Sequence, residues 1–127
     1  MKAVLKELVS PDIDFDTYWP KEEDDFGFLL EATIGPDDAE GGHDYQIFVC
    51  SPKWLMKHHE KDDLVWGRHM LIAFEYDLKR IKQKIERFCS RCTGNDWAEM
   101  AAKIARIARI GLWEFEDYRE YEPPTDH

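Results

Sequence analysis

Cys89 and Cys92 have the Cys-x-x-Cys spacing that zinc sites and redox centres use. A structural zinc site needs four ligands, and the sequence contains no second Cys-x-x-Cys pair and no His-x-x-x-His pair. Cys92 also continues the apolar stripe of a helix expected around it, so both thiols are interpreted as structural side chains. We therefore expect no metal site and no cofactor.

Cys50 and Ser51 stand where a strand-like segment meets Pro52, and some hydrolases place their nucleophile at such a turn. His43 and His69 are the candidate bases. The glycines of a Gly-x-Ser-x-Gly turn are missing, and Ser51-Pro52 is explained by an ordinary helix start. A small hydrolase that uses Cys50 or Ser51 with one of these histidines is kept as an alternative function.

Three carboxylates near the end of the chain, Glu114, Glu116 and Asp117, stand beside aromatic residues, as in sites that cleave sugars. The chain has 27 Asp and Glu residues, so such neighbours arise by chance. No glycine-rich phosphate-binding motif occurs, and nucleotide binding is not predicted. The basic residues between positions 79 and 91 lack interleaved aromatic residues, which favours a solvated helix face over a nucleic-acid patch.

Alternation of apolar and polar residues predicts strands in the first half of the chain. Residues 2–9 form a first strand, and residues 26–34 form the clearest one, with the even-numbered side chains on one face. Residues 45–50 are expected to pair antiparallel with it across a polar, glycine-containing connection. Residues 69–76 are apolar on both faces, which predicts a central fourth strand. Residues 112–118 are a candidate final strand.

Three helices are expected in the second half of the chain. The first covers residues 52–60, the second follows Asp77, and the third runs from Trp97 to a stop at Gly111. The second has apolar side chains at spacings of three and four, namely Leu78, Ile81, Ile85, Phe88 and Cys92. The five tryptophans are expected to be mostly core anchors, with one or two exposed at an interface.

Strands come mainly first and helices mainly last, which favours the α+β class. We expect a mainly antiparallel sheet of four or five strands with about three helices packed on one face. A length of 127 residues fits one domain. That domain is expected to cover residues 1–119, followed by a frayed tail at residues 120–127, which contain two prolines and few apolar groups.

The charge of the chain is strongly acidic, with 17 Lys and Arg against 27 Asp and Glu and a net charge of −10. Phosphates repel such a protein, so we expect no nucleic acid and no membrane as partner, and a basic protein instead. No apolar run approaches the ~20 residues of a membrane span, and the charged N-terminus does not resemble a signal peptide. Three cysteines suit a reducing compartment, so a cytoplasmic location is expected.

Short segments along nearly the whole chain occur in an order and spacing that are specific as a set. They are Lys2-Ala3-Val4-Leu5-Lys6-Glu7-Leu8 with Ser10-Pro11-Asp12, Phe26-Gly27-Phe28-Leu29-Leu30 with Ile34-Gly35-Pro36, Phe48-Val49-Cys50-Ser51-Pro52-Lys53-Trp54-Leu55, Gly67-Arg68-His69, and Trp113-Glu114-Phe115-Glu116-Asp117-Tyr118. In these segments the sequence resembles the immunity protein 8 family of bacterial polymorphic toxin systems. The loop at residues 37–44 and the tail after Tyr118 carry no part of the resemblance.

The resemblance implies an α+β fold and a cytoplasmic, non-enzymatic antidote. Such a protein binds the toxic C-terminal domain of a cognate toxin that a neighbouring or sister cell delivers. Family members stand beside varied toxin domains, many of them nucleases. Because a nuclease is basic where it holds phosphates, we expect the acidic chain to bind that basic surface.

The contact surfaces of immunity proteins vary with the toxin, which favours acidic loops that lie outside the matching segments. The expected toxin-binding residues are Asp24, Asp25, Asp37, Asp38 and Glu40, with Glu114, Glu116 and Asp117 as a second group. Charge reversal in the 37–40 loop is expected to slow association. An acidic regulatory module with an unrelated protein partner is the remaining alternative.

Overall fold

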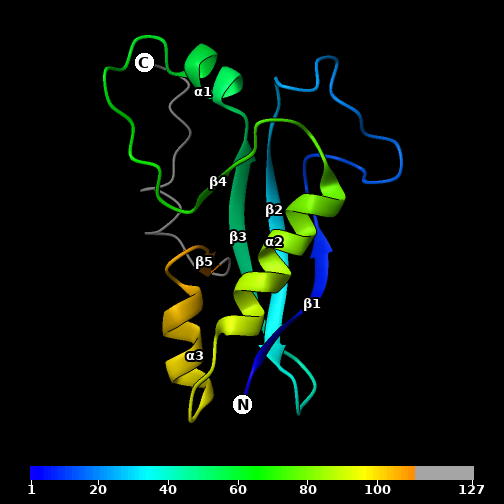
Figure 1. Cartoon of the computed structure of the whole chain (residues 1–127), viewed down its shortest axis with the longest axis vertical. Helices are drawn as coiled ribbons and strands as arrows, with labels where there is room; N and C mark the ends of the chain where they lie inside the picture. The colour runs from blue at the N-terminus through cyan, green and yellow to red at the C-terminus, as the bar shows by residue number, and fades with distance from the viewer. Residues whose placement is uncertain (111–127) are drawn as a thin grey trace.

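The computed structural model describes residues 1–110, with side chains up to residue 108 (Figure 1). In chain order the elements are β1 (Ala3–Val9), β2 (Gly27–Pro36), β3 (His43–Cys50), α1 (Pro52–His58), β4 (Met70–Ile72), α2 (Leu78–Arg91), α3 (Trp97–Ile104) and β5 (Arg109–Ile110). The expected α+β class is confirmed. The expected strand at residues 112–118, the domain limit at residue 119 and the tail at residues 120–127 lie outside the described residues and stay predictions.

The sheet has the order β1-β2-β3-β4, and β5 pairs with the same edge of β3 that β4 occupies further along. β1 pairs antiparallel with β2, and β2 pairs antiparallel with β3, with Leu30 opposite Ile47. The hairpin expected between the second and third strands is therefore confirmed. Only β4 runs parallel to its neighbour among the described strands.

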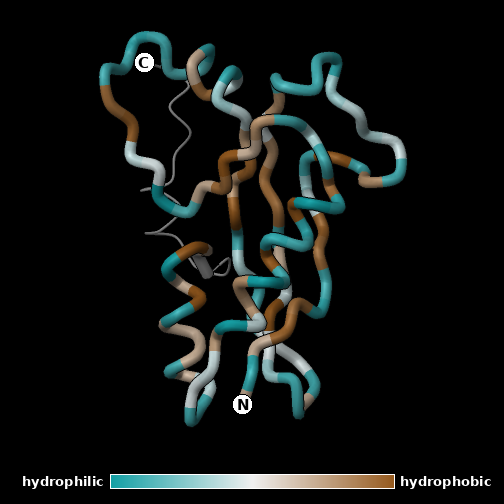
Figure 2. Tube along the Cα trace, viewed as in Figure 1, coloured by the Kyte–Doolittle hydropathy of each residue, from teal (hydrophilic) through white to brown (hydrophobic). Residues whose placement is uncertain are grey.

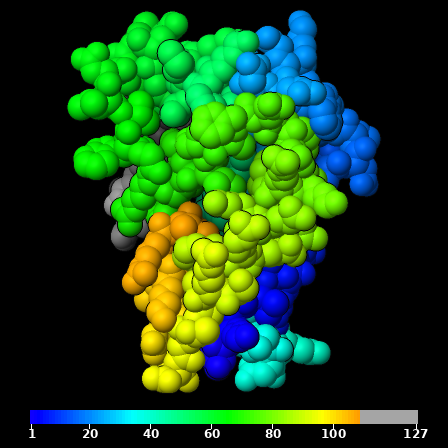
Figure 3. Space-filling view, viewed as in Figure 1, coloured from blue at the N-terminus to red at the C-terminus, as the bar shows by residue number. Residues whose placement is uncertain are grey.

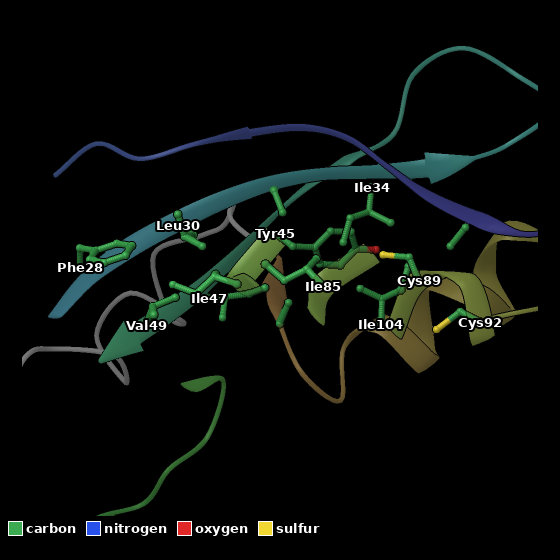
Figure 4. Packing of buried hydrophobic residues seen from close by; sticks show 14 of the residues in the cluster. Phe28, Leu30, Ile34, Tyr45, Ile47, Val49, Ile85, Cys89, Cys92 and Ile104 are labelled. Atoms are coloured by element: carbon green, nitrogen blue, oxygen red, sulfur yellow. The ribbon is translucent and has the colours of Figure 1, made fainter. Parts of the chain in front are cut away.

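The core lies between one face of this sheet and the helices α2 and α3 (Figure 4). The even-numbered side chains from Phe26 to Ile34 are all buried, as their alternation predicts. They meet Ile81, Ile85 and Cys89 from α2 and Met100 and Ile104 from α3. The apolar stripe of α2 is thus the surface that holds this helix on the sheet.

The expectation of a long central strand at residues 69–76 is wrong. β4 contains three residues and lies at the edge of the sheet, beside β3. The backbone N–H of Ala73 still donates to Cys50, where β3 ends, and beyond it the chain leaves the sheet, with the N–H of Tyr76 donating to Glu23 instead. Phe74 is consequently exposed, and the alternation in the second half of this segment does not correspond to sheet faces.

The third helix is shorter than expected. It ends at Ile104, and residues 109–110 form β5, which pairs with Tyr45 and Gln46 of β3. Ala108 is buried, as the helical pattern suggests, but the residues directly after it pair with β3 in the sheet instead of continuing the helix. Tertiary pairing has overridden the local helical preference here.

The expectation for the tryptophans holds in part among residues 1–108: two are exposed, as expected, and the other two are partly rather than fully buried. Trp54 and Trp97 are partly buried, whereas Trp19 and Trp66 are exposed. The core is instead filled by Phe28, Tyr45 and aliphatic side chains.

Helix α1 sits at the end of the sheet, where its Trp54 packs closely against β2. Ser51 is its N-cap, as predicted, and accepts a hydrogen bond from the backbone N–H of Trp54 at 3.2 Å. The indole ring of Trp54 lies over Gly27, where an added Cβ would be 2.4 Å from its Cε2 atom. Gly27 faces away from the core side that Phe28 occupies, so the sheet accepts α1 there only because this position has no side chain.

We predict that Gly27→Ala destabilises the protein by about 1–3 kcal/mol, because the new methyl group must displace the indole of Trp54. Chemical unfolding followed by tryptophan fluorescence measures this. Gly67→Ala is the matched control, since a Cβ at Gly67 meets nothing within 4 Å, and it should change stability by less than about 0.5 kcal/mol. Equal stabilities of the two variants would contradict the proposed contact.

Candidate functional site

The two acidic clusters expected to bind a partner lie at opposite ends of the sheet (Figure 1). Residues 22–25 precede the first residue of β2, and residues 37–40 follow its last. Ten strand residues at about 3.3 Å each separate them by roughly 30 Å. In Figure 3 the blue and green atoms of residues around 20 and 60 occupy one end, and the cyan hairpin turn occupies the other. The two clusters therefore do not form one patch.

The cluster at residues 22–25 is paired with lysines of α1. The Nζ of Lys53 lies 3.0 Å from Glu22 Oε2 and 3.6 Å from Asp24 Oδ1, and Lys57 pairs with Asp25. The hydrogen bond that Lys53 donates to Glu22, together with the nearby carboxylates, raises the pKa of Lys53. Part of the negative charge counted in the sequence is thus balanced within the chain.

The cluster at residues 37–40 forms the tip of the β2–β3 hairpin. Asp37 accepts a hydrogen bond from the backbone N–H of Lys2 at 3.2 Å, and Lys6 donates to the carbonyl of Ala39. Asp38 and Glu40 are exposed. Glu114, Glu116 and Asp117 lie outside the described residues.

The candidate nucleophiles of a hydrolase are enclosed. Cys50 is fully buried, and burial raises the pKa of its thiol to about 11. Ser51 is buried too, and its Oγ accepts hydrogen bonds at 3.2 Å from the backbone N–H groups of Phe26 and Trp54. A neutral buried thiol and a hydroxyl committed to the backbone are poor nucleophiles.

The candidate bases lie elsewhere. His43 is seven residues before Cys50 on the same strand, about 23 Å away, and its ring packs at a tilt against Trp97 with ring centroids 5.5 Å apart. His69 precedes β4, and its Nε2 is 3.1 Å from the carbonyl oxygen of Ala105. Since Met70 pairs with Phe48 in a parallel register, His69 lies beside Ile47, which is three residues before Cys50. The structure therefore brings neither histidine to the candidate nucleophiles.

Cys89 and Cys92 belong to the packing between α2 and β3. Both are buried, and both have a raised pKa, chiefly because of burial. In Figure 4 the hydroxyl of Tyr45 points toward Cys89, and burial raises the pKa of Tyr45 to about 12. Within residues 1–110 there is no group of three or more His, Cys, Asp or Glu side chains placed to hold a metal ion.

Comparison with known proteins assigns the chain to a family. The family model for immunity protein 8 matches residues 3–118, which is most of the chain. The chain belongs to the immunity protein 8 family. No curated protein and no solved structure matches it. Among residues 1–110 no helix has both the length and the apolar character that crossing a bilayer requires.

In this immunity protein 8 family member, sequence reasoning missed a set of exposed apolar side chains. Leu64 and Trp66 are 91 % and 93 % exposed, and both lie in the loop between α1 and β4. The sequence offered one signal: an apolar Leu-Val-Trp run that follows two aspartates and fits no helical or strand period.

We predict that the three cysteines of the native family member react slowly with thiol reagents. With a pKa of about 11, Cys50 is thiolate in about one molecule in a thousand at pH 8, and it is buried as well. Because the pKa is raised, reactivity should stay low until the pH approaches 11. Reaction with an aromatic disulfide reagent at pH 8 measures this. All three thiols should react in denaturant and none rapidly without it; fast native labelling at Cys50 would revive the hydrolase alternative.

Proposed function

We propose that this chain neutralises the toxic C-terminal domain of a cognate bacterial toxin by stoichiometric, non-catalytic binding in the cytoplasm. The observation that carries the proposal is the immunity protein 8 family match over residues 3–118. The enclosed thiol of Cys50 and the committed hydroxyl of Ser51 favour binding over catalysis. Inhibition by such an antidote requires a surface that binds the toxin domain, and it requires no nucleophile or other catalytic group.

The toxin domain is proposed to be basic, and a nuclease in particular. A net charge of −10 attracts a protein whose active surface holds phosphates through Lys and Arg. An acidic chain bound to such a surface excludes the nucleic acid from it by occupying the same positive groups.

We propose both acidic clusters as contacts: Asp24 and Asp25 at one end of β2, and Asp37, Asp38 and Glu40 at the other. The centre of a single compact interface can lie on only one of these clusters. A standard interface covers about 800 Å² per partner, roughly 30 Å across. That is close to the length of β2, which separates the clusters. Choosing between the two ends requires an observation other than charge.

We predict that co-expression rescues growth. The C-terminal domain of the toxin encoded next to this chain should stop growth when expressed alone, and simultaneous expression of this chain should restore it. The two proteins should co-purify as a 1:1 complex. The purified toxin domain should degrade plasmid DNA or cellular RNA, and one equivalent of this chain should stop the degradation.

The matched controls are an empty vector and the toxin domain of an unrelated system, which this chain should not neutralise. Persistent killing with no complex would contradict the immunity function and favour an acidic regulatory module. Rescue of a toxin domain that degrades no nucleic acid would retain the immunity function and refute the nuclease.

We also predict that salt slows association between the chain and the toxin domain. Attraction between a chain of charge −10 and a basic partner is screened within about 10 Å at 0.1 M salt. The association rate constant should fall about tenfold or more between 0.02 and 0.5 M NaCl, with a much smaller change in the dissociation rate. Stopped-flow tryptophan fluorescence measures both, and a salt-independent association rate would contradict a basic partner surface.

A further inference from the structure

Exposed apolar side chains gather in one stretch of the chain. Ten large hydrophobic side chains are exposed within the described residues, and six of them lie between Met56 and Phe74. The six are Met56, Leu64, Val65, Trp66, Ile72 and Phe74. Figure 2 shows a hydrophobic stretch, in brown, within the otherwise pale or teal loop after α1. Scattered single exposures are ordinary on protein surfaces, whereas exposed apolar side chains that adjoin one another, as Leu64, Val65 and Trp66 do along the chain, are typical of a contact site.

The loop that carries Leu64 and Trp66 is held at both of its ends. At its start the backbone N–H of Asp62 donates to the carbonyl of His59 at 2.9 Å, and the Nδ1 of His59 lies 3.1 Å from Asp62 Oδ2. At its end the carbonyl of His69 accepts from the N–H of Phe48, and the His69 ring contacts Ala105. A loop fixed at both ends loses less conformational entropy when a partner binds it.

The acidic segment before β2 is joined to the same end of the molecule. Glu23 accepts a backbone hydrogen bond from Tyr76 at 2.8 Å, and the rings of Trp19 and Tyr76 are 5.2 Å apart. Lys53 of α1 pairs with Glu22. We call residues 19–25 and 52–77 the α1 end of the molecule. It carries nine acidic and five basic side chains, a net charge of −4.

We propose that the α1 end is the toxin-binding surface, with Trp66 and Leu64 entering an apolar depression on the toxin domain and the carboxylates of Glu60 and Asp63 facing its basic rim. This inference rests on the proposed function and selects one of the two ends between which charge alone does not decide. Tryptophan is the residue type most enriched among side chains that dominate binding energy. The surrounding carboxylates supply the charge complementarity that a basic partner needs.

The hairpin end offers a weaker combination. Asp38 and Glu40 are exposed there, but the exposed apolar side chains nearest to them in the sheet are Val4 and Met1, which are smaller or at the chain terminus. Charge reversal in the 37–40 loop thus becomes the comparison that tests the choice between the two ends.

The experiment measures binding of the full chain to the purified toxin domain by biolayer interferometry. Trp66→Ala and the double variant Leu64→Ala with Trp66→Ala should each raise the Kd by about tenfold or more, mainly through faster dissociation. Val9→Ala, an exposed apolar residue on β1, is the matched control and should bind like the wild type. Because Leu64 and Trp66 are exposed, their removal should leave the melting temperature within about 2 °C of the wild type.

Charge reversal supplies the second arm. Glu60→Lys with Asp63→Lys should slow association about threefold or more at low salt, and Asp38→Lys with Glu40→Lys should change it less. Each pair changes the net charge by the same amount, so a difference between them reports location. The larger effect at Asp38 and Glu40 would overturn the proposal in favour of the hairpin end.

The remaining outcomes are also decisive. Wild-type affinity of the Leu64→Ala, Trp66→Ala double variant, with growth rescue intact, would overturn the surface assignment and leave the immunity function standing. A double variant that binds toxin normally but converts a dimer of this chain to a monomer in sedimentation would assign the surface to a second copy. A wild-type chain that neither binds nor rescues would refute the proposed function itself.

Discussion

The buried hydroxyl of Ser51 connects three parts of the structure on which the candidate surface depends. Its oxygen accepts hydrogen bonds from the start of β2 at Phe26 and from the first turn of α1 at Trp54, while its own backbone N–H donates to Phe26. With that oxygen in place, the end of β3, the beginning of β2 and the first turn of α1 occupy fixed positions relative to each other. Gly27 then leaves room for the Trp54 ring, and the lysines of α1 come within reach of Glu22 and Asp25. A buried oxygen shared in this way is costly to leave without partners, so these segments are stable only together.

Much of the fold follows from local pattern. The alternation from Phe26 to Ile34 identifies the inner face of β2, and the spacing of Ile81 and Ile85 identifies the inner face of α2, because each period reports burial on one side. The edge position of β4 and the early end of α3 do not follow from pattern. Both depend on hydrogen bonds to β3 from residues more than 20 positions away, and a single sequence contains no record of such pairing.

The candidate site is harder to predict for a related reason. The sequence identifies carboxylate clusters at residues 22–25 and 37–40, but the balance of charge at Asp25 depends on Lys57, which is 32 positions later. The sequence also contains Trp66 and Trp54, but only the folded chain shows that the side chain of Trp66 is exposed whereas that of Trp54 is partly buried. Exposure of a large apolar side chain is a property of the assembled surface, so it carries a functional meaning that composition lacks.

The parallel pairing of β3 with β4 requires the chain to travel back along the molecule, and the loop with Leu64 and Trp66 is part of that return. The hydrogen bonds of the sheet hold the two ends of this path, whereas the side chains of Leu64 and Trp66 in its middle are exposed and contribute little to the fold. Mutations that accumulate in the middle therefore leave the folding core intact. An immunity protein built this way can change the sequence of its exposed loop as the toxin domain changes, while the residues that hold the fold together stay the same.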